Sequence, residues 1–190
     1  MENKQNIKRC EWCSNDPIYQ NYHDQEWGVP KYDDHTLFEM LILEGAQAGL
    51  SWITILKRRE NYRQAFDGFD IDKVANYGSK EEAKLLNNSG IIRNKLKIKS
   101  AIRNAQVFKQ IQAEYGSFSA YLWRYVNHKP MINDFSTAQD VPVTDEIAKV
   151  LSKDLKKRGM SFVGPVIMYS YMQSIGMVND HTLDCFKRKN

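Results

Sequence analysis

The stretch LKKRGMSFVGPVIMYSY, residues 155–171, predicts two helices joined by a short hairpin. The segment leading into it, residues 144–159, has Thr144 as a candidate N-cap, then acidic residues, and basic residues at its end. This charge order matches the helix dipole and predicts a helix that ends at Gly159. Pro165 stands where a second helix would begin. The stretch therefore predicts helix, hairpin and helix.

This hairpin is also a candidate phosphate site. The first N–H groups of a helix have no partner within it, so the helix after Gly164 can bind an anion. Lys156, Lys157 and Arg158 add positive charge beside it, which suits a DNA phosphate. The alternative is an ordinary helical hairpin whose charges face water. Residues 87–95, NNSGIIRNK, repeat the pattern more weakly.

The region 34–66 predicts two helices that meet near Gly45 and Gly49. Asp34 is a candidate N-cap, and apolar residues recur behind it at helical spacing until the glycines interrupt the pattern. A further helix is expected to begin near Asp70.

The rest of the chain continues the helical pattern. Residues 79–88, SKEEAKLLNN, predict a helix with Ser79 as its cap, and residues 94–116 predict a long amphipathic helix that Gly116 ends. Residues 127–134, NHKPMIND, predict a short extended loop, and no segment has a convincing strand pattern. We therefore expect an all-α protein.

Composition restricts the class of protein. The chain has 190 residues, 42% of them hydrophobic, which suits one ordered domain over residues 1–190. No apolar run is long enough to span a membrane, and the N-terminal MENKQNIKRC lacks the apolar core of a secretory signal. We expect a cytoplasmic monomer with no membrane contact. The net charge of +4 is modest, so local basic clusters matter more than the total.

Cysteines and histidines at the two ends of the chain predict a metal site. His181 and Cys185 are four residues apart, so a helix would present both on one face, and Cys10 and His23 could complete the set. Two thiolates and two imidazoles favour a closed structural zinc site. Cys13 could replace Cys10 or His23, and a set without metal is the alternative.

Glu44 is a carboxylate in an apolar context, LEGAQAGLSW, residues 43–52. A buried glutamate needs a cationic partner, either from the protein or from a ligand. Aromatic rings around one carboxylate suit a planar cation through stacking and a charge-assisted hydrogen bond. The candidate rings are Trp12, Tyr19, Tyr22, Trp27 and Trp52.

Several motifs together resemble a known enzyme family. They are CEW, YHDQEWGVP, LFEMLILEGAQAGLSWITILKRRENYR, SGIIRN, WRYVNHKP, LSKDLKKRGMSFVGPVIMYSYMQSIGMVNDH and the final cysteine. The chain resembles the 3-methyladenine DNA glycosylase I family over about residues 8–186. The resemblance implies the all-α fold of helix-hairpin-helix DNA glycosylases.

The resemblance also implies a structural zinc ion, one Zn²⁺ per chain, that ties the N-terminal segment to the C-terminal segment. The four ligands of the family fall on Cys10, His23, His181 and Cys185. The family's cysteine has the context C-x-W, which leaves Cys13 as a departure from the pattern.

The implied activity is base excision repair of double-stranded DNA. The N-glycosidic bond of 3-methyladenine is hydrolysed, which releases the free base and leaves an abasic site. Glu44 falls on the catalytic and base-binding carboxylate, with Trp52 and Tyr22 as aromatic walls. Trp12, Tyr19 and Trp27 match nearby aromatic positions. Methylation at N3 makes adenine cationic, so the base can leave without being protonated.

The sequence leaves some roles open. Asp180 could activate the attacking water or could orient His181. Leu50 could wedge into the duplex or could pack in the core. Two other functions stay possible: an inactive, zinc-containing DNA-binding scaffold, and a broader glycosylase that also removes 7-methylguanine.

Overall fold

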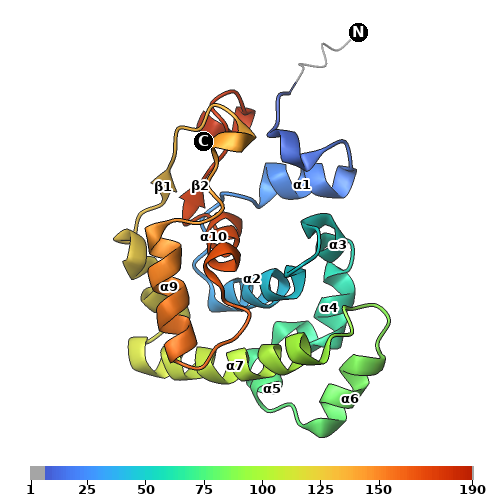
Figure 1. Cartoon of the computed structure of the whole chain (residues 1–190). Helices are drawn as coiled ribbons and strands as arrows, with labels where there is room; N and C mark the ends of the chain where they lie inside the picture. Colours follow the sequence, from blue (N-terminus) through green and yellow to red (C-terminus); the bar gives the residue numbers. More distant parts are fainter. Residues whose placement is uncertain (1–6, 190) are drawn as a thin grey trace.

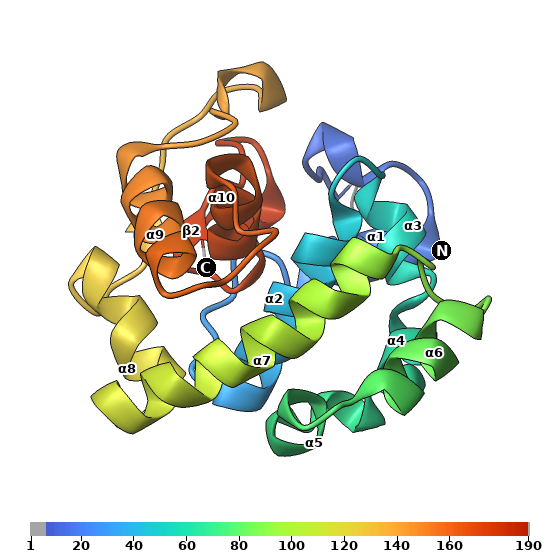
Figure 2. The ribbon, with the colours of Figure 1, turned by 60° about the horizontal axis from the view of Figure 1, so that its bottom comes forward.

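A computed structural model describes residues 7–189, and this part of the chain is mostly helical. Helix α2 (Asp34–Gln47) lies at the centre, between α10 (Pro165–Ser174) on one side and α3 (Trp52–Leu56) on the other (Figure 1). The long helix α7 (Lys95–Tyr115) packs against α2, lying below it in Figure 1 and crossing in front of it in Figure 2. The other α-helices are α1 (Pro17–Gln25), α4 (Arg59–Ala65), α5 (Ile71–Ala75), α6 (Ser79–Asn87), α8 (Phe118–Trp123) and α9 (Glu146–Lys157).

Shorter elements join these helices. The 3-10 turns are η1 (Glu11–Cys13), η2 (Asp67–Phe69), η3 (Arg124–Val126), η4 (Ala138–Asp140) and η5 (Phe186–Lys189). Two strands of two residues each, β1 (Met131–Ile132) and β2 (Val178–Asn179), pair in parallel. The extended segment expected within residues 127–134 thus contains a strand that pairs with the chain beyond α10. No described helix is long and apolar enough to cross a membrane.

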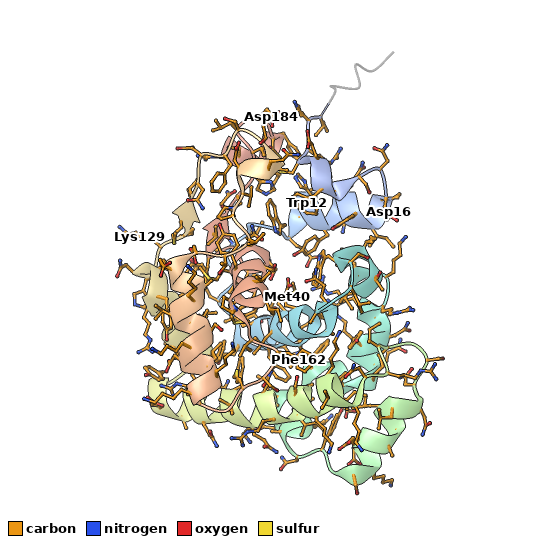
Figure 3. All side chains as sticks on the ribbon, in the orientation of Figure 1. Trp12, Asp16, Met40, Lys129, Phe162 and Asp184 are labelled. Carbon is orange, nitrogen blue, oxygen red and sulfur yellow. The ribbon has the colours of Figure 1, made fainter. Side chains whose placement is uncertain are left out.

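Helix α2 is buried along almost its whole length, which places Glu44 inside the molecule. Its residues from Leu37 to Ala46 are all buried, and Met40 lies in the interior of the molecule (Figure 3). A helix that is apolar on every side belongs in a core, because no face of it is suited to water. Glu39 and Glu44 are the exceptions, and they are satisfied differently.

Glu39 has partners within the chain. Its carboxylate accepts hydrogen bonds from Arg59 and Arg63, and Arg59 also binds Glu26. This ion-paired cluster compensates the cost of burying Glu39.

Three predicted N-caps are wrong by one residue. Asp33 caps α2 in place of Asp34, because its backbone is extended and its carboxylate accepts from the Thr36 N–H at 2.7 Å. Asp34 lies in the first turn and accepts from the backbone N–H groups of Phe118 and Ser119 at the start of α8. Its charge therefore stabilises a different helix from the predicted one.

The other two errors have similar causes. Gly78 precedes α6, and Glu81 accepts from its backbone N–H, so Ser79 is already helical. Asp145 caps α9 by accepting from Ala148 N–H at 2.6 Å, which displaces Thr144 from that position. The helix expected to begin near Asp70 is confirmed as α5, and Asp70 is its N-cap.

Residues 34–66 form three helices where two were predicted. The chain breaks a second time at Lys57 and Arg58, between α3 and α4. The break at Gly49 agrees with its positive φ of +77°. The end of α7 at Gly116 and the start of α10 at Pro165 are confirmed.

Candidate active site and metal centre

A cavity of about 330 Å³ opens beside the C-terminal end of α2. One wall consists of aromatic side chains from the N-terminal segment and α3, and the opposite wall consists of α10 and residues 138–143. Trp12 lies in the N-terminal segment that covers the cavity (Figure 3). Every predicted pocket residue lines this cavity: Trp12, Tyr19, Tyr22, Trp27, Glu44 and Trp52.

Glu44 lies in the wall of the cavity without a full set of partners. Its side chain is buried, and among the described residues its Oε2 atom has no hydrogen-bond partner. Burial raises the pKa of Glu44 to about 8, an effect that the neighbouring Ser174 hydroxyl partly opposes. A buried carboxyl group in this state can bind a ligand that supplies a donor or a positive charge.

The aromatic wall is continuous. The rings of Tyr22 and Trp52 have centroids 5.4 Å apart, and Trp12 contacts Tyr19 and Trp27 at 5.0 and 4.8 Å. Burial raises the pKa of Tyr22 well above its ordinary value, and the charge of Glu44 adds to this, so its hydroxyl stays protonated. Within the described part of the chain, the indole Nε1 atoms of Trp12 and Trp52 lack partners, as Glu44 Oε2 does.

Asp180 also lines the cavity, but it is already held by three donors. Tyr169 Oη donates to it at 2.7 Å, Gln173 Nε2 at 2.8 Å and Asn133 Nδ2 at 2.7 Å. The alternative in which Asp180 orients His181 is wrong, because the His181 Nε2 atom lies 3.2 Å from the Trp27 carbonyl oxygen instead.

A second buried group of polar side chains lies next to the cavity. Cys10, His23, His181 and Cys185 are all buried, and the ligand atoms of all four lie within 4.8 Å of one another. Cys185 Sγ is 3.4 Å from His23 Nε2 and 3.5 Å from His181 Nδ1, and Cys10 Sγ is 3.6 Å from the same Nδ1. These four residues could hold a metal ion.

Each histidine turns its other ring nitrogen away from this group, toward an oxygen. His23 Nδ1 lies 2.8 Å from Asp24, and His181 Nε2 meets the Trp27 carbonyl. An outward N–H on each ring leaves the inward nitrogen unprotonated, so that its lone pair faces the cluster. The inward nitrogen of His23 also accepts the Cys10 backbone N–H at 3.3 Å. A hydrogen bond from the Cys10 thiol is the main cause of a lowered pKa of Cys185, which favours a thiolate there.

Cys13 is outside this group. It is buried in η1, and its thiol lies 3.8 Å from the Ser14 carbonyl oxygen. Cys10, and not Cys13, therefore lies beside the two histidines and Cys185.

The predicted DNA-binding residues occupy two turns. Lys156 and Lys157 are exposed at the end of α9, and Gly159 has a φ of +99° in the hairpin. Arg158 is instead engaged within the chain: its guanidinium binds Glu114 at 2.6 Å and Asp154 at 3.3 Å. The second turn joins α2 to α3 and carries Leu50, which is 40% exposed and so is not a core residue.

Sequence reasoning missed the wall of the cavity that α10 supplies. Val166, Ser170 and Gln173 line it, together with Tyr169. The spacing of 166, 169 or 170, and 173 is that of one helix face, so the pattern was recognisable once a helix from Pro165 had been predicted. Residues 138–143 had no such signal, since they form one short 3-10 turn followed by a loop.

Comparisons with known proteins agree with this arrangement. The family model of methyladenine glycosylase matches residues 12–188. The chain is 48% identical over 179 residues to DNA-3-methyladenine glycosylase 1 of Escherichia coli K12, covering 94% of this chain and 96% of that protein. It is 46% identical to DNA-3-methyladenine glycosylase of Haemophilus influenzae, covering 93% and 96%.

Solved structures match equally well. A crystal structure of 3-methyladenine DNA glycosylase I superposes with a TM-score of 0.92 at 46% identity, covering 94% of this chain and 98% of that one. A structure of the Staphylococcus aureus enzyme, described as the basis of 3-methyladenine recognition, has a TM-score of 0.92 at 40% identity, covering 96% and 97%. The chain belongs to the methyladenine glycosylase family.

Proposed function

We propose that this protein removes 3-methyladenine from double-stranded DNA by hydrolysing the N-glycosidic bond. The observation that carries the proposal is the buried Glu44 carboxyl, whose Oε2 atom has no partner in the described residues and faces a cavity walled by Tyr22 and Trp52. Relatives at 46–48% identity are named for this activity. An inactive scaffold would have no need of such a costly group.

The chemistry of the lesion fits these residues. The N3-methyl group places a positive charge on adenine, so the base departs as a neutral molecule and needs no general acid. Flipping the damaged nucleotide out of the duplex costs a few kcal/mol. Glu44 would accept a hydrogen bond from the base, and the rings of Tyr22 and Trp52 would stack on it. The positive charge of the bound base would favour the ionised form of Glu44, and this pairing of opposite charges separates the cationic lesion from neutral purines.

The buried cluster would hold a structural zinc ion through Cys10, His23, His181 and Cys185. Zinc with bonds of about 2.3 Å to sulfur and about 2.1 Å to nitrogen places neighbouring S and N ligands roughly 3.6 Å apart in a tetrahedron. The observed S···N separations of 3.4, 3.5 and 3.6 Å agree with that value. Four protein ligands leave no open position, so the ion would support the fold and not the reaction.

DNA would bind to the turn between α9 and α10 as a helix-hairpin-helix motif. The first turn of α10 after Pro165, which itself has no N–H, offers the backbone N–H groups of Val166 and Ile167, and the exposed Lys156 and Lys157 end the preceding helix α9. Leu50, exposed on the neighbouring turn, would wedge into the duplex where the base has left. We expect a monomer that acts in the cytoplasm as one domain.

The test is to incubate the protein with methylated DNA and identify the released bases by chromatography. The proposal predicts release of 3-methyladenine, with 7-methylguanine retained. Absence of any released base would indicate a DNA-binding scaffold, and equal release of 7-methylguanine would indicate a broader alkylpurine glycosylase. Either result would contradict the proposal.

A further inference from the structure

The hairpin between α9 and α10 contains a strained residue. Phe162 has a φ of +54°, a left-handed backbone conformation that is unfavourable for residues other than glycine. Such a residue stays in place only when its surroundings hold it, and strained positions cluster at sites that bind ligands. The contacts on either side of Phe162 are therefore informative.

Both neighbours of Phe162 are held by buried polar side chains. Asn104 of α7, which is 3% exposed, donates from Nδ2 to the Ser161 carbonyl at 2.9 Å and accepts from the Ser161 N–H at 3.0 Å. On the other side, the Ser152 hydroxyl of α9 donates to the Val163 carbonyl at 2.6 Å. The Asn104 carboxamide thus binds both backbone groups of one residue, as a neighbouring strand would.

The same face of α7 also holds the end of α2. Lys97 lies seven residues before Asn104, two helical turns away, so both side chains project on one side. Its Nζ donates to the Ala46 and Ala48 carbonyls at 2.8 and 2.6 Å. Helix α7 therefore contacts the turn that carries Leu50 through Lys97 and the hairpin through Asn104. Arg103, next to Asn104, adds a longer hydrogen bond to the Gly159 carbonyl at 3.4 Å.

The hairpin also rests directly on the helix of the pocket. A Cβ atom at Gly45 would meet the Cβ of Phe162 at 3.5 Å and its carbonyl oxygen at 3.6 Å. Gly45 follows Glu44 in sequence, so any shift of Phe162 occurs one residue from the pocket carboxyl. The hairpin, the Leu50 turn and Glu44 have fixed relative positions because of these contacts.

We propose that Asn104 is a positioning residue for DNA binding. It keeps the strained hairpin in the shape that presents its N–H groups to a phosphate, at a fixed distance from the Leu50 turn and Glu44. This inference rests on the proposed function, since it requires that the hairpin binds DNA. Asn104 itself would touch neither the base nor the phosphate.

The substitution Asn104→Ala removes both hydrogen bonds to Ser161. Ser161 is exposed, so water can replace them, and the fold persists while the hairpin gains freedom. A matched control is Gln106→Ala, which removes a side-chain amide on the same helix that donates to the Ala75 carbonyl at 3.1 Å, away from the hairpin. Both variants lose stability, but only one alters the hairpin.

The measurement compares two ligands for each variant. For Asn104→Ala we expect affinity for duplex DNA to fall about tenfold, the scale of two hydrogen bonds. Affinity for free 3-methyladenine, followed by the fluorescence of the pocket tryptophans, should stay within about twofold. In single-turnover excision the DNA concentration for half-maximal rate should rise, with the maximal rate kept.

Two results would overturn the inference. If Asn104→Ala and Gln106→Ala have the same DNA affinity, Asn104 has only a structural role. If Asn104→Ala loses DNA and free base equally, the defect lies in the pocket and not in the hairpin. A parent protein that fails to bind DNA or release base would instead contradict the proposed function, so the two failures are distinguishable.

Discussion

The metal cluster and the base pocket are both buried and polar and lie side by side, yet their polar groups are satisfied differently. In the cluster, each histidine has an outward partner, Asp24 or the Trp27 carbonyl, and its inward nitrogen meets a sulfur. In the pocket, Glu44 Oε2 has no hydrogen-bond partner within the described chain. The cluster could hold a metal ion, whereas the pocket leaves a carboxyl oxygen available to a ligand.

Disrupting the cluster should have the largest effect on stability. Structural zinc contributes on the order of 10 kcal/mol to the folding of small metal domains, so Cys10→Ser or strong chelation should greatly lower the melting temperature. Elemental analysis should find one zinc per parent chain and less in Cys10→Ser. Cys13→Ser is the matched control and should keep its zinc. Retained zinc in Cys10→Ser, with loss in Cys13→Ser, would move the ligand to Cys13.

Removing the pocket carboxyl should raise the stability of the fold, whereas disrupting the cluster should lower it. The pKa of Glu44 is raised from 4.5 to about 8 in the folded protein, so folding loses stability as pH rises from about 4.5 through 8. Glu44→Gln removes that loss, and its stability relative to the parent should increase by a few kcal/mol between pH 4 and pH 9. Denaturant unfolding at both pH values measures this. If the unfolding free energies of variant and parent differ by the same amount at both pH values, Glu44 has a partner within the protein.

Trp52→Ala should weaken the pocket without any dependence on ligand charge. Stacking of a base on an aromatic side chain contributes about 1–3 kcal/mol, so affinity for free 3-methyladenine should fall roughly tenfold or more. Neutral purines should lose affinity by a similar factor. An effect confined to 3-methyladenine would mean that Trp52 does more than stack.

The same contrast between satisfied and available groups applies to the hairpin, with a smaller effect. Arg158 is bound to Glu114 and Asp154, whereas Lys157 is exposed. Lys157→Glu should weaken DNA binding on any sequence and reduce its salt slope by about one unit for each phosphate that the protein no longer neutralises. Arg158→Ala should instead lower stability and leave the salt slope of DNA binding nearly unchanged. The reverse result would place Arg158 on the DNA.

Much of the site was predictable from sequence because its chemistry depends on residue type. Four side chains near the two chain ends that could bind a metal ion, and one glutamate in an apolar helix, were recognisable without coordinates. The partners of Arg158 were not, because Glu114 is 44 residues away and no periodic pattern connects them. The double hydrogen bond from Asn104 to Ser161 likewise depends on packing of α7 against the hairpin.

We propose that the Glu44 carboxyl is kept without a full set of partners so that it can bind the cationic base. The most direct test is the single-turnover rate of 3-methyladenine release from methylated DNA by Glu44→Gln. Hydrogen bonds to charged groups contribute about 1.5–3 kcal/mol, so we expect a loss on the order of ten- to a hundredfold in a variant that remains folded. A variant that releases 3-methyladenine at the rate of the parent would contradict the account.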